Sequence, residues 1–256
     1  MILTQDRFLL SNLASVFSYQ GVEKKYIQEL FGGIETTYDS MLRYLTFGKD
    51  GYWKSLLLLK AALRNGHRVV DAAAGTGVLT FRIADLVAPE GRVLGVDISK
   101  EMLRVAKLKQ QAHPNIRLVD FTLAAAEKLP VDDETVDCLT SCYLLKYCDL
   151  RRTLMEAFRA LKPGGKFVGY DFTTPSSSVL GKLSGAYIFR GLPSLSKIVV
   201  SKGTKRVLMD LPMIISETKW DVRIPDIALA SGFRNLEVSR LTSGVVTLVY
   251  CEKPSC

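Results

Sequence analysis

The sequence predicts an α/β fold: a mostly parallel sheet with helices on both faces, an antiparallel C-terminal hairpin, and a helical N-terminal extension and lid. Two observations lead to this prediction. Between residues 68 and 171, short apolar stretches alternate with amphipathic stretches of about ten residues, the pattern of repeated strand–helix–strand units. Near the C-terminus, two further apolar stretches flank Ser243-Gly244, a pair suited to a tight turn between antiparallel strands.

The first 65 residues are expected to form a helical cap. Apolar side chains recur at helical spacing over residues 4–30, with an interruption near Gly21. A second helix is expected around Tyr38–Leu45, and a third from Trp53 to Leu63, where Asn65-Gly66 ends it.

Residues 66–172 are expected to form the core that binds a cofactor. Its predicted strands are residues 68–72, 93–96, 117–123, 136–141 and 166–171. Its predicted helices are residues 79–86, 100–111 and 150–161. Residues 173–220 interrupt the alternation and are interpreted as a lid or substrate segment. Residues 221–256, with a short helix at 225–231 and the terminal hairpin, are expected to complete the core sheet.

Composition restricts the class of protein. The 256 residues suit one large domain or one domain with an appended lid, and 48% hydrophobic with 23% charged residues is ordinary for a soluble globular chain. No apolar run reaches the ~18–20 residues of a membrane span, and no signal peptide is recognisable. Five cysteines without a C-x-x-C pair indicate free thiols in a reducing cytoplasm, and two histidines make a His-based metal site unexpected.

The turn after the first core strand carries the main functional signal. In "VVDAAAGTGVLT", Asp71 precedes the turn formed by Gly75, Thr76 and Gly77, between a predicted strand and a predicted helix. A dinucleotide fingerprint would place a third glycine where Thr80 stands, and no Walker loop is present. A carboxylate beside the turn would repel a pyrophosphate but would pair with a cation. S-Adenosylmethionine carries an α-ammonium and a sulfonium and has no phosphate, so it fits this turn best.

The second core strand adds a matching feature. It ends at Asp97, an acid placed to accept hydrogen bonds from both ribose hydroxyls of a nucleoside. Ile98 follows directly, and Met102 would lie one turn into the next helix, where it can cover an adenine face or simply belong to the core. An NAD site would also require Asp97, so the combination with Asp71 is what favours S-adenosylmethionine.

Four stretches together resemble the ubiquinone/menaquinone-biosynthesis C-methyltransferases, within the class I S-adenosylmethionine-dependent methyltransferases with a Rossmann-like fold. They are "LFGGIETTYDSMLRYLTFGKDGYWK", "DAAAGTGVLT", "LKPGGKFVGYDFTTP" and "LTSGVVTLVYCEK", and the resemblance extends from about Leu30 to Lys253. The second stretch is common to the whole superfamily, whereas the other stretches narrow the resemblance. It implies C-methylation of a prenylated, demethylmenaquinol-like quinol in quinone biosynthesis.

The resemblance also implies the site residues. Cofactor contacts would fall at Thr76, Asp97, Ala125, Ala126 and Cys142. Ala125 stands where the family usually has Asp or Asn, and Cys142 stands where Ser or Ala is common.

The acceptor side departs further from the family. Lys146 replaces the arginine of Gly-Leu-Arg-Asn, and Asp171 replaces the glutamate of Glu-Phe-Ser. A cation such as Lys146 would stabilise a phenolate during methyl transfer. Tyr38, Asp50 and Asp171, with Asp39 beside them, are candidates for contacts with hydroxyl groups or for accepting a proton, although structural roles are equally compatible with these residues.

The excess of basic residues suggests an anionic partner. Lysines and arginines number 34 against 26 acids. Between Gly181 and Arg206 no acid occurs, and the basic residues are Lys182, Arg190, Lys197, Lys202, Lys205 and Arg206. The apolar residues between them are Tyr187, Ile188, Phe189, Leu192, Leu195, Ile198, Val199 and Val200. This pattern suits peripheral binding to an anionic membrane, although a lid with solvated lysines would show it too.

Other readings stay open. The acceptor can be another lipid or a small molecule methylated on nitrogen or oxygen. A nucleic-acid methyltransferase is less favoured, because "SCYLLKY" stands where an N/D-P-P-Y/F motif would follow the fourth core strand. Nucleic acid is therefore not an expected partner, and a homodimer is compatible with the sequence.

Overall fold

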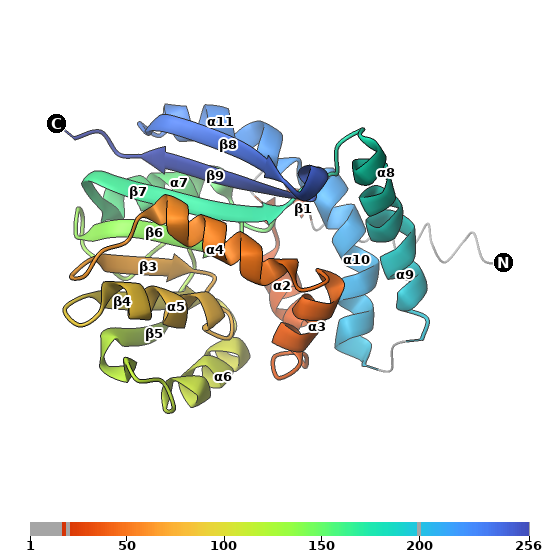
Figure 1. Cartoon of the computed structure of the whole chain (residues 1–256), viewed down its shortest axis with the longest axis horizontal. Coiled ribbons are helices and arrows are strands. Elements are labelled where there is room, and N and C mark those ends of the chain that lie inside the picture. The colour runs from red at the N-terminus through yellow and green to blue at the C-terminus, as the bar shows by residue number, and fades with distance from the viewer. Residues whose placement is uncertain (1–16, 19–20, 199–200, 256) are drawn as a thin grey trace.

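The computed structural model describes residues 17–18, 21–198 and 201–255, and a seven-stranded sheet forms its centre (Figure 1). The strand order is β5-β4-β3-β6-β7-β9-β8. The strands are β3 (Arg68–Ala72), β4 (Arg92–Asp97), β5 (Val119–Leu123), β6 (Val136–Cys142), β7 (Leu161–Phe172), β8 (Arg234–Leu241) and β9 (Val246–Glu252). Strands β3 to β7 pair in parallel, and β9 pairs antiparallel with β7 and β8. The predicted fold class, including the C-terminal hairpin, is confirmed.

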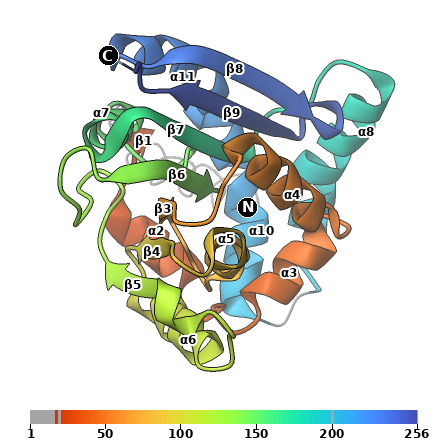
Figure 2. The same cartoon turned by 60° about the vertical axis from the view of Figure 1, so that its left-hand side comes forward.

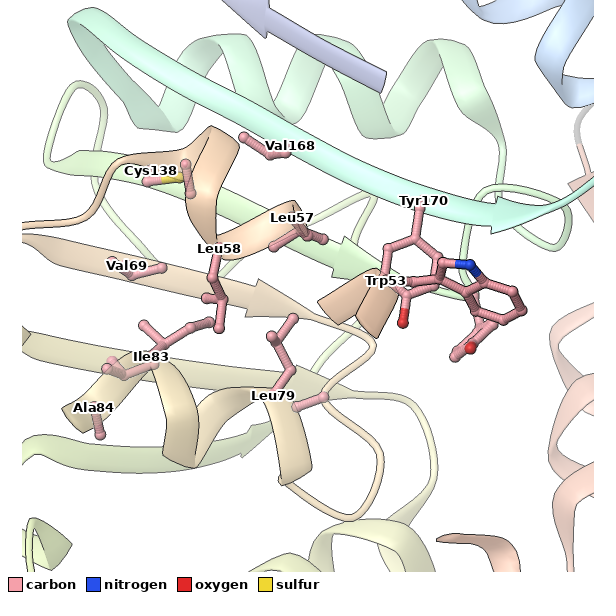
Figure 3. Packing of buried hydrophobic residues seen from close by; sticks show 14 of the residues in the cluster. Trp53, Leu57, Leu58, Val69, Leu79, Ile83, Ala84, Cys138, Val168 and Tyr170 are labelled. Carbon is pink, nitrogen blue, oxygen red and sulfur yellow. The ribbon is translucent and has the colours of Figure 1, made fainter. Parts of the chain in front are cut away.

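Helices cover both faces of the sheet because successive strand residues point to opposite sides. Val69 of β3 packs on the side of α4 (Lys49–Ala61), α5 (Val78–Val87) and α6 (Lys100–Gln110). Figure 3 shows this layer, with Leu57 and Leu58 of α4 close to the sheet. Val70 packs on the other side, together with α7 (Leu150–Ala160) and α11 (Trp220–Ala230).

The N-terminal region is helical only in part. Helix α2 (Lys24–Phe31) and α3 (Tyr38–Leu45) form as expected. The helical spacing predicted over residues 4–30 is wrong at residues 17–18, because β1 (Phe17–Ser18) pairs antiparallel with β2 (Gly21–Val22). The Val22 amide donates to the Tyr147 carbonyl at 2.9 Å, which holds this segment extended against the core. Residues 4–16 of the same stretch lie outside the described residues.

Residues 173–220 consist largely of helices. They contain α8 (Val179–Ala186), the π-helical turn η2 (Tyr187–Gly191), α9 (Leu192–Leu195) and α10 (Lys202–Thr218). Figures 1 and 2 place α8, α10 and α3 at the end of the sheet toward which the parallel strands point. The Tyr26 hydroxyl of α2 donates to Asp210 of α10 at 2.6 Å, so this segment is tied to the N-terminal helices.

Candidate active site

A cavity of about 520 Å³ lies at the carboxyl ends of β3, β4 and β6. The chain order reverses at β3, since β4 lies on one side of it and β6 on the other. Loops that leave neighbouring strands in opposite directions open a crevice at such a point, where α/β proteins bind ligands. Helices α2, α3 and α4 cover this crevice and contribute lining residues from the N-terminal region.

The two glycines of the turn after β3 have different roles. Gly75, at φ +55°, lines the cavity, and a Cβ atom there would meet no protein atom within 4 Å. Gly77, at φ +83°, does not line it, and its Cβ would lie 2.8 Å from Phe81. Gly75 therefore leaves room for a ligand, whereas a side chain at Gly77 would clash with the Phe81 ring of α5.

Asp97 stands at the end of β4 as predicted, and it organises the adjacent loops. Its Oδ2 accepts from the Gly75 amide at 2.8 Å, and its Oδ1 accepts from the Ser99 amide at 2.9 Å. Burial raises the pKa of this half-buried carboxyl group. Ile98 and Met102 line the cavity beside it. The result is a carboxylate next to an apolar surface, which suits a ribose joined to a base.

The loop after β5 also contributes to the lining of the cavity. Ala126 lines the cavity, but Ala125 does not, and its neighbours Ala124 and Glu127 do. Glu127 accepts from the Asp149 amide at 3.3 Å and pairs with Lys24 of α2 at 3.2 Å. Sequence reasoning missed Glu127 because its neighbours in space come from distant parts of the chain.

Asp71 supplies a buried negative charge in the same cavity. It is 1% exposed and accepts from the hydroxyls of Thr80 at 2.6 Å and Thr140 at 3.1 Å. Burial raises its pKa to about 6, while the two hydroxyls and the charge of Lys54 act in the opposite direction. The carboxyl group is thus ionised near neutral pH, as a partner for a cation requires.

Polar contacts hold the N-terminal helices over this cavity. The Gln28 side chain donates to the Ile98 carbonyl at 2.9 Å. Asp39 of α3 accepts from the Thr76 hydroxyl at 2.6 Å and forms an ion pair with Lys109 of α6. The predicted cofactor residue Thr76 therefore lines the cavity and also joins α3 to the glycine turn.

Asp50, at the start of α4, accepts hydrogen bonds from three side chains. Lys54 donates to both of its oxygens at 2.5 Å, the Tyr143 hydroxyl donates at 2.7 Å, and the Tyr170 hydroxyl donates at 3.2 Å. Asp50 and Lys54 both line the first cavity. Lys54 was not predicted as a site residue, although a lysine within the apolar run after Trp53 is a weak sign that its ammonium has a partner.

A second cavity, about 330 Å³ and mainly apolar, adjoins the first. Apolar side chains from α3, α8, η2 and α10 contribute to its lining. The residues that line both cavities are Phe31, Tyr38, Leu42, Tyr143 and Tyr147. We call these five residues the shared wall. Two ligands in the two cavities would meet at this wall.

Lys146 and Asp171 form a buried ion pair beside the second cavity. Their side chains are 2% and 0% exposed, and Nζ lies 2.5 Å from Oδ1. Asp171 also accepts from the backbone amides of Lys146 at 3.0 Å and Phe172 at 2.7 Å. Burial lowers the pKa of Lys146, and the charge of Asp171 opposes that effect. Lys146 lines the second cavity, whereas Asp171 lines neither cavity and lies behind the lysine.

Tyr38 and Cys142 complete the predicted set. Tyr38 belongs to the shared wall, and among the described residues its hydroxyl has no hydrogen-bond partner, so it is available to a ligand. Burial raises the pKa of Tyr38 and of the Cys142 thiol, which lines the first cavity. Cys138, Cys142, Cys148 and Cys251 are all free thiols.

Within the described ranges no helix is long and apolar enough to span a bilayer.

Comparison with known sequences points to one family. The sequence model of the ubiE/COQ5 methyltransferase family matches residues 19–253. The protein named ubiquinone/menaquinone biosynthesis C-methyltransferase UbiE from Pasteurella multocida is 32% identical over 228 residues, covering 88% of this chain and 84% of that protein. The protein of the same name from Pseudomonas paraeruginosa is 32% identical over 244 residues, covering 93% and 94%.

Solved structures share the fold at lower identity. Phosphoethanolamine N-methyltransferase 2 from Haemonchus contortus, in complex with S-adenosyl-L-methionine, matches with a TM-score of 0.62 and 16% identity, covering 93% of this chain and 60% of that one. A SAM-dependent methyltransferase from Aquifex aeolicus matches with a TM-score of 0.56 and 18% identity, covering 78% and 89%.

Proposed function

Since the chain belongs to the ubiE/COQ5 methyltransferase family and is an S-adenosylmethionine-dependent methyltransferase, we propose that it methylates a ring carbon of a prenylated quinol. The observation that carries the proposal is the apolar second cavity with Lys146 in its lining. Among the described residues that line it, Lys146 is the buried cation, since Lys49 is exposed. An apolar site with one buried cation suits an aromatic ring that carries an ionisable hydroxyl group.

The first cavity, called the cofactor cavity below, fits S-adenosylmethionine. Gly75 leaves space for a ligand, Asp97 offers a carboxylate to a ribose, and Asp71 faces the cavity with a negative charge. Ile98, Met102 and Ala126 provide apolar surface for an adenine ring. When bound, S-adenosylmethionine supplies a methyl group on a positively charged sulfur, and catalysis then depends on positioning the acceptor in line with it.

Lys146 acts on the acceptor in this proposal. Its ammonium group stabilises the oxygen of a deprotonated quinol, and the charge delocalised into the ring makes the ring carbon nucleophilic. Asp171 positions the lysine through the 2.5 Å contact. We assign Asp50 as the group that receives the hydroxyl proton, through the Tyr143 hydroxyl that donates to it at 2.7 Å. After transfer, the methylated ring carbon releases its own proton to water, and the proton held by Asp50 returns through Tyr143 to the phenolate oxygen, which restores the aromatic quinol.

A labelling experiment tests the acceptor. The protein is incubated with methyl-labelled S-adenosylmethionine and a reduced lipid extract that contains demethylated prenyl quinols. We expect the label in a quinone fraction whose mass increases by one methylene unit and whose fragmentation places the methyl group on the ring carbon. Label on a lipid amine, or on a hydroxyl group of a small molecule, would contradict the proposal and identify a different acceptor.

We further propose that the acceptor reaches the second cavity from an anionic membrane. Helix α8 exposes three apolar side chains: Val179 is 76%, Leu180 65% and Leu183 64% exposed. Leu183 also lines the second cavity, as does Phe47 from the α3–α4 corner, which is 74% exposed. An exposed apolar surface beside an apolar cavity suits a long hydrocarbon tail that stays in the bilayer.

The basic residues supply the complementary charge, with two adjustments to the sequence-based expectation. Lys182, Arg190, Lys197, Lys202 and Lys205 are exposed. Arg206 instead lies near Glu29 and Asp210, at 3.5 and 3.6 Å. Of the interleaved apolar residues, Ile188 and Leu192 are buried in the core, and Val199 and Val200 lie outside the described residues. Val179 and Leu180 of α8 lie just before that basic stretch in the sequence, and Leu183 lies within it.

Vesicle flotation tests this surface. With anionic vesicles at low salt we expect the protein to float, because each basic residue near such a surface contributes ~1 kcal/mol, and high salt should release it. The double variant Val179→Glu/Leu180→Glu should bind weakly, whereas Leu108→Glu, at an exposed position on α6, should bind like wild type. Recovery in the soluble fraction with neutral and anionic vesicles alike, at either salt concentration, would contradict the membrane route.

A further inference from the structure

Lys54 is a buried lysine of the cofactor cavity to which the proposed methyl-transfer mechanism gives no role. It is 6% exposed and projects from α4 on the same side as Trp53 and Leu57, which are also buried. Burying an ammonium group is costly unless the charge is paired. The ammonium group of Lys54 therefore requires partners of opposite charge in or beside the cavity.

Asp50 pairs with Lys54 but does not exhaust its hydrogen-bonding capacity. An ammonium group has three N–H donors, and among the described residues its acceptors are the two oxygens of Asp50. Asp50, in contrast, also accepts from Tyr143 and Tyr170. Three side chains thus donate to the carboxylate, whereas the ammonium keeps one donor for a ligand in the cavity that it lines.

Asp71 supplies the opposite charge in the same cavity. It is buried, it is ionised near neutral pH, and it is close enough to Lys54 for the charge of the lysine to affect its pKa. Both residues line the cavity, while Asp97, with Ile98 and Met102 beside it, offers the ribose and adenine surface. One positive and one negative side chain close together match the carboxylate and the ammonium of an α-amino acid.

The other cations of this cavity fit that role less well. Lys24 is exposed and pairs with Glu127 at 3.2 Å, and Arg43 is exposed on α3. Lys109, which does not line the cavity, pairs with Asp39. Among the described residues, Lys54 is therefore the cation that lines this cavity and is shielded from water.

We propose that Lys54 binds the α-carboxylate of S-adenosylmethionine, so that Lys54 and Asp71 together recognise the intact α-amino acid end of the cofactor. The proposal rests on the cofactor and is independent of the identity of the methyl acceptor. It predicts that the protein discriminates against analogues that lack the carboxylate. A hydrogen bond between two charged groups in a buried site accounts for a preference of about 10- to 100-fold.

Calorimetry with two ligands tests this preference without any methyl transfer. S-Adenosylmethionine and decarboxylated S-adenosylmethionine differ only in the carboxylate, so the ratio of their dissociation constants isolates that group. Wild type should prefer the intact cofactor by about 10- to 100-fold. Lys54→Met should reduce this ratio to about threefold or less, mainly by weakening the binding of the intact cofactor.

Two further variants make the test specific. Lys60→Met lies on the same helix, where the partly exposed Lys60 pairs with Glu237, and it should keep the wild-type ratio. If Lys54→Met does not fold because Asp50 loses its partner, Lys54→Met/Asp50→Asn removes both charges and should show the same reduced ratio. Equal binding of the two ligands by wild type, or an unchanged ratio in either Lys54 variant, would overturn the proposal.

Discussion

Replacing Lys146 by methionine is expected to lower kcat about 100-fold, the scale of removing a donor that stabilises a developing oxyanion. Methionine keeps much of the side-chain length but lacks the charge that Lys146 brings to the second cavity. The affinity for S-adenosylmethionine should not change, because Lys146 does not line the cofactor cavity. Steady-state kinetics on the prenyl quinol and calorimetry with the cofactor measure the two effects separately.

The control for this experiment addresses folding. Lys146→Met leaves Asp171 buried without its cation, and breaking a buried pair in this way typically costs about 3–5 kcal/mol of stability. Lys146→Met/Asp171→Asn removes that imbalance and should regain stability without regaining turnover. Lys162→Met, at a partly exposed ion pair with Asp137, should behave as wild type. Wild-type turnover in the correctly folded Lys146→Met protein would exclude the lysine from the mechanism.

Replacing Asp97 by alanine is expected to weaken the binding of S-adenosylmethionine by about 2–3 kcal/mol, because the ribose hydroxyls lose a charged acceptor. The same change removes the acceptor of the Gly75 and Ser99 amides, so the loops around the ligand lose their organising contact. Asp120→Ala, at an exposed position of β5, provides the control. Calorimetry that found tight binding by Asp97→Ala would remove this residue from the site.

The sheet could be predicted from sequence because its signals are local. Strand and helix periodicities differ, and the glycine turn with Asp71 and Asp97 lies within three consecutive predicted elements. The hairpin was equally accessible, since Ser243 at φ +55° and Gly244 at φ +83° form the turn between β8 and β9. These features require no knowledge of contacts between distant segments.

The missed features depend on contacts between distant segments. The pairing of Lys146 with Asp171 follows from the register of β6 and β7, where Cys142 lies opposite Tyr170, and both strands extend beyond their predicted ends. Lys54 lines the cofactor cavity because α4 packs over the sheet, and Glu127 lies in that cavity's lining beside α2, where it pairs with Lys24. Within residues 173–206, helical periodicity could not distinguish the buried Ile188 from the exposed Leu183 before the packing of α10 was known.

The shared wall also has a kinetic consequence. The exposed residues that line the cofactor cavity include Lys24, Gln28 and Arg43. The exposed residues that line the second cavity include Phe47 and Leu183. Each cavity thus includes exposed residues that the other does not, so neither ligand has to pass through the site of the other to reach water. Neither ligand therefore blocks the exit of the other, and the arrangement of the two cavities does not impose an order of binding. A spent cofactor can be exchanged while the methylated product is still leaving the second cavity.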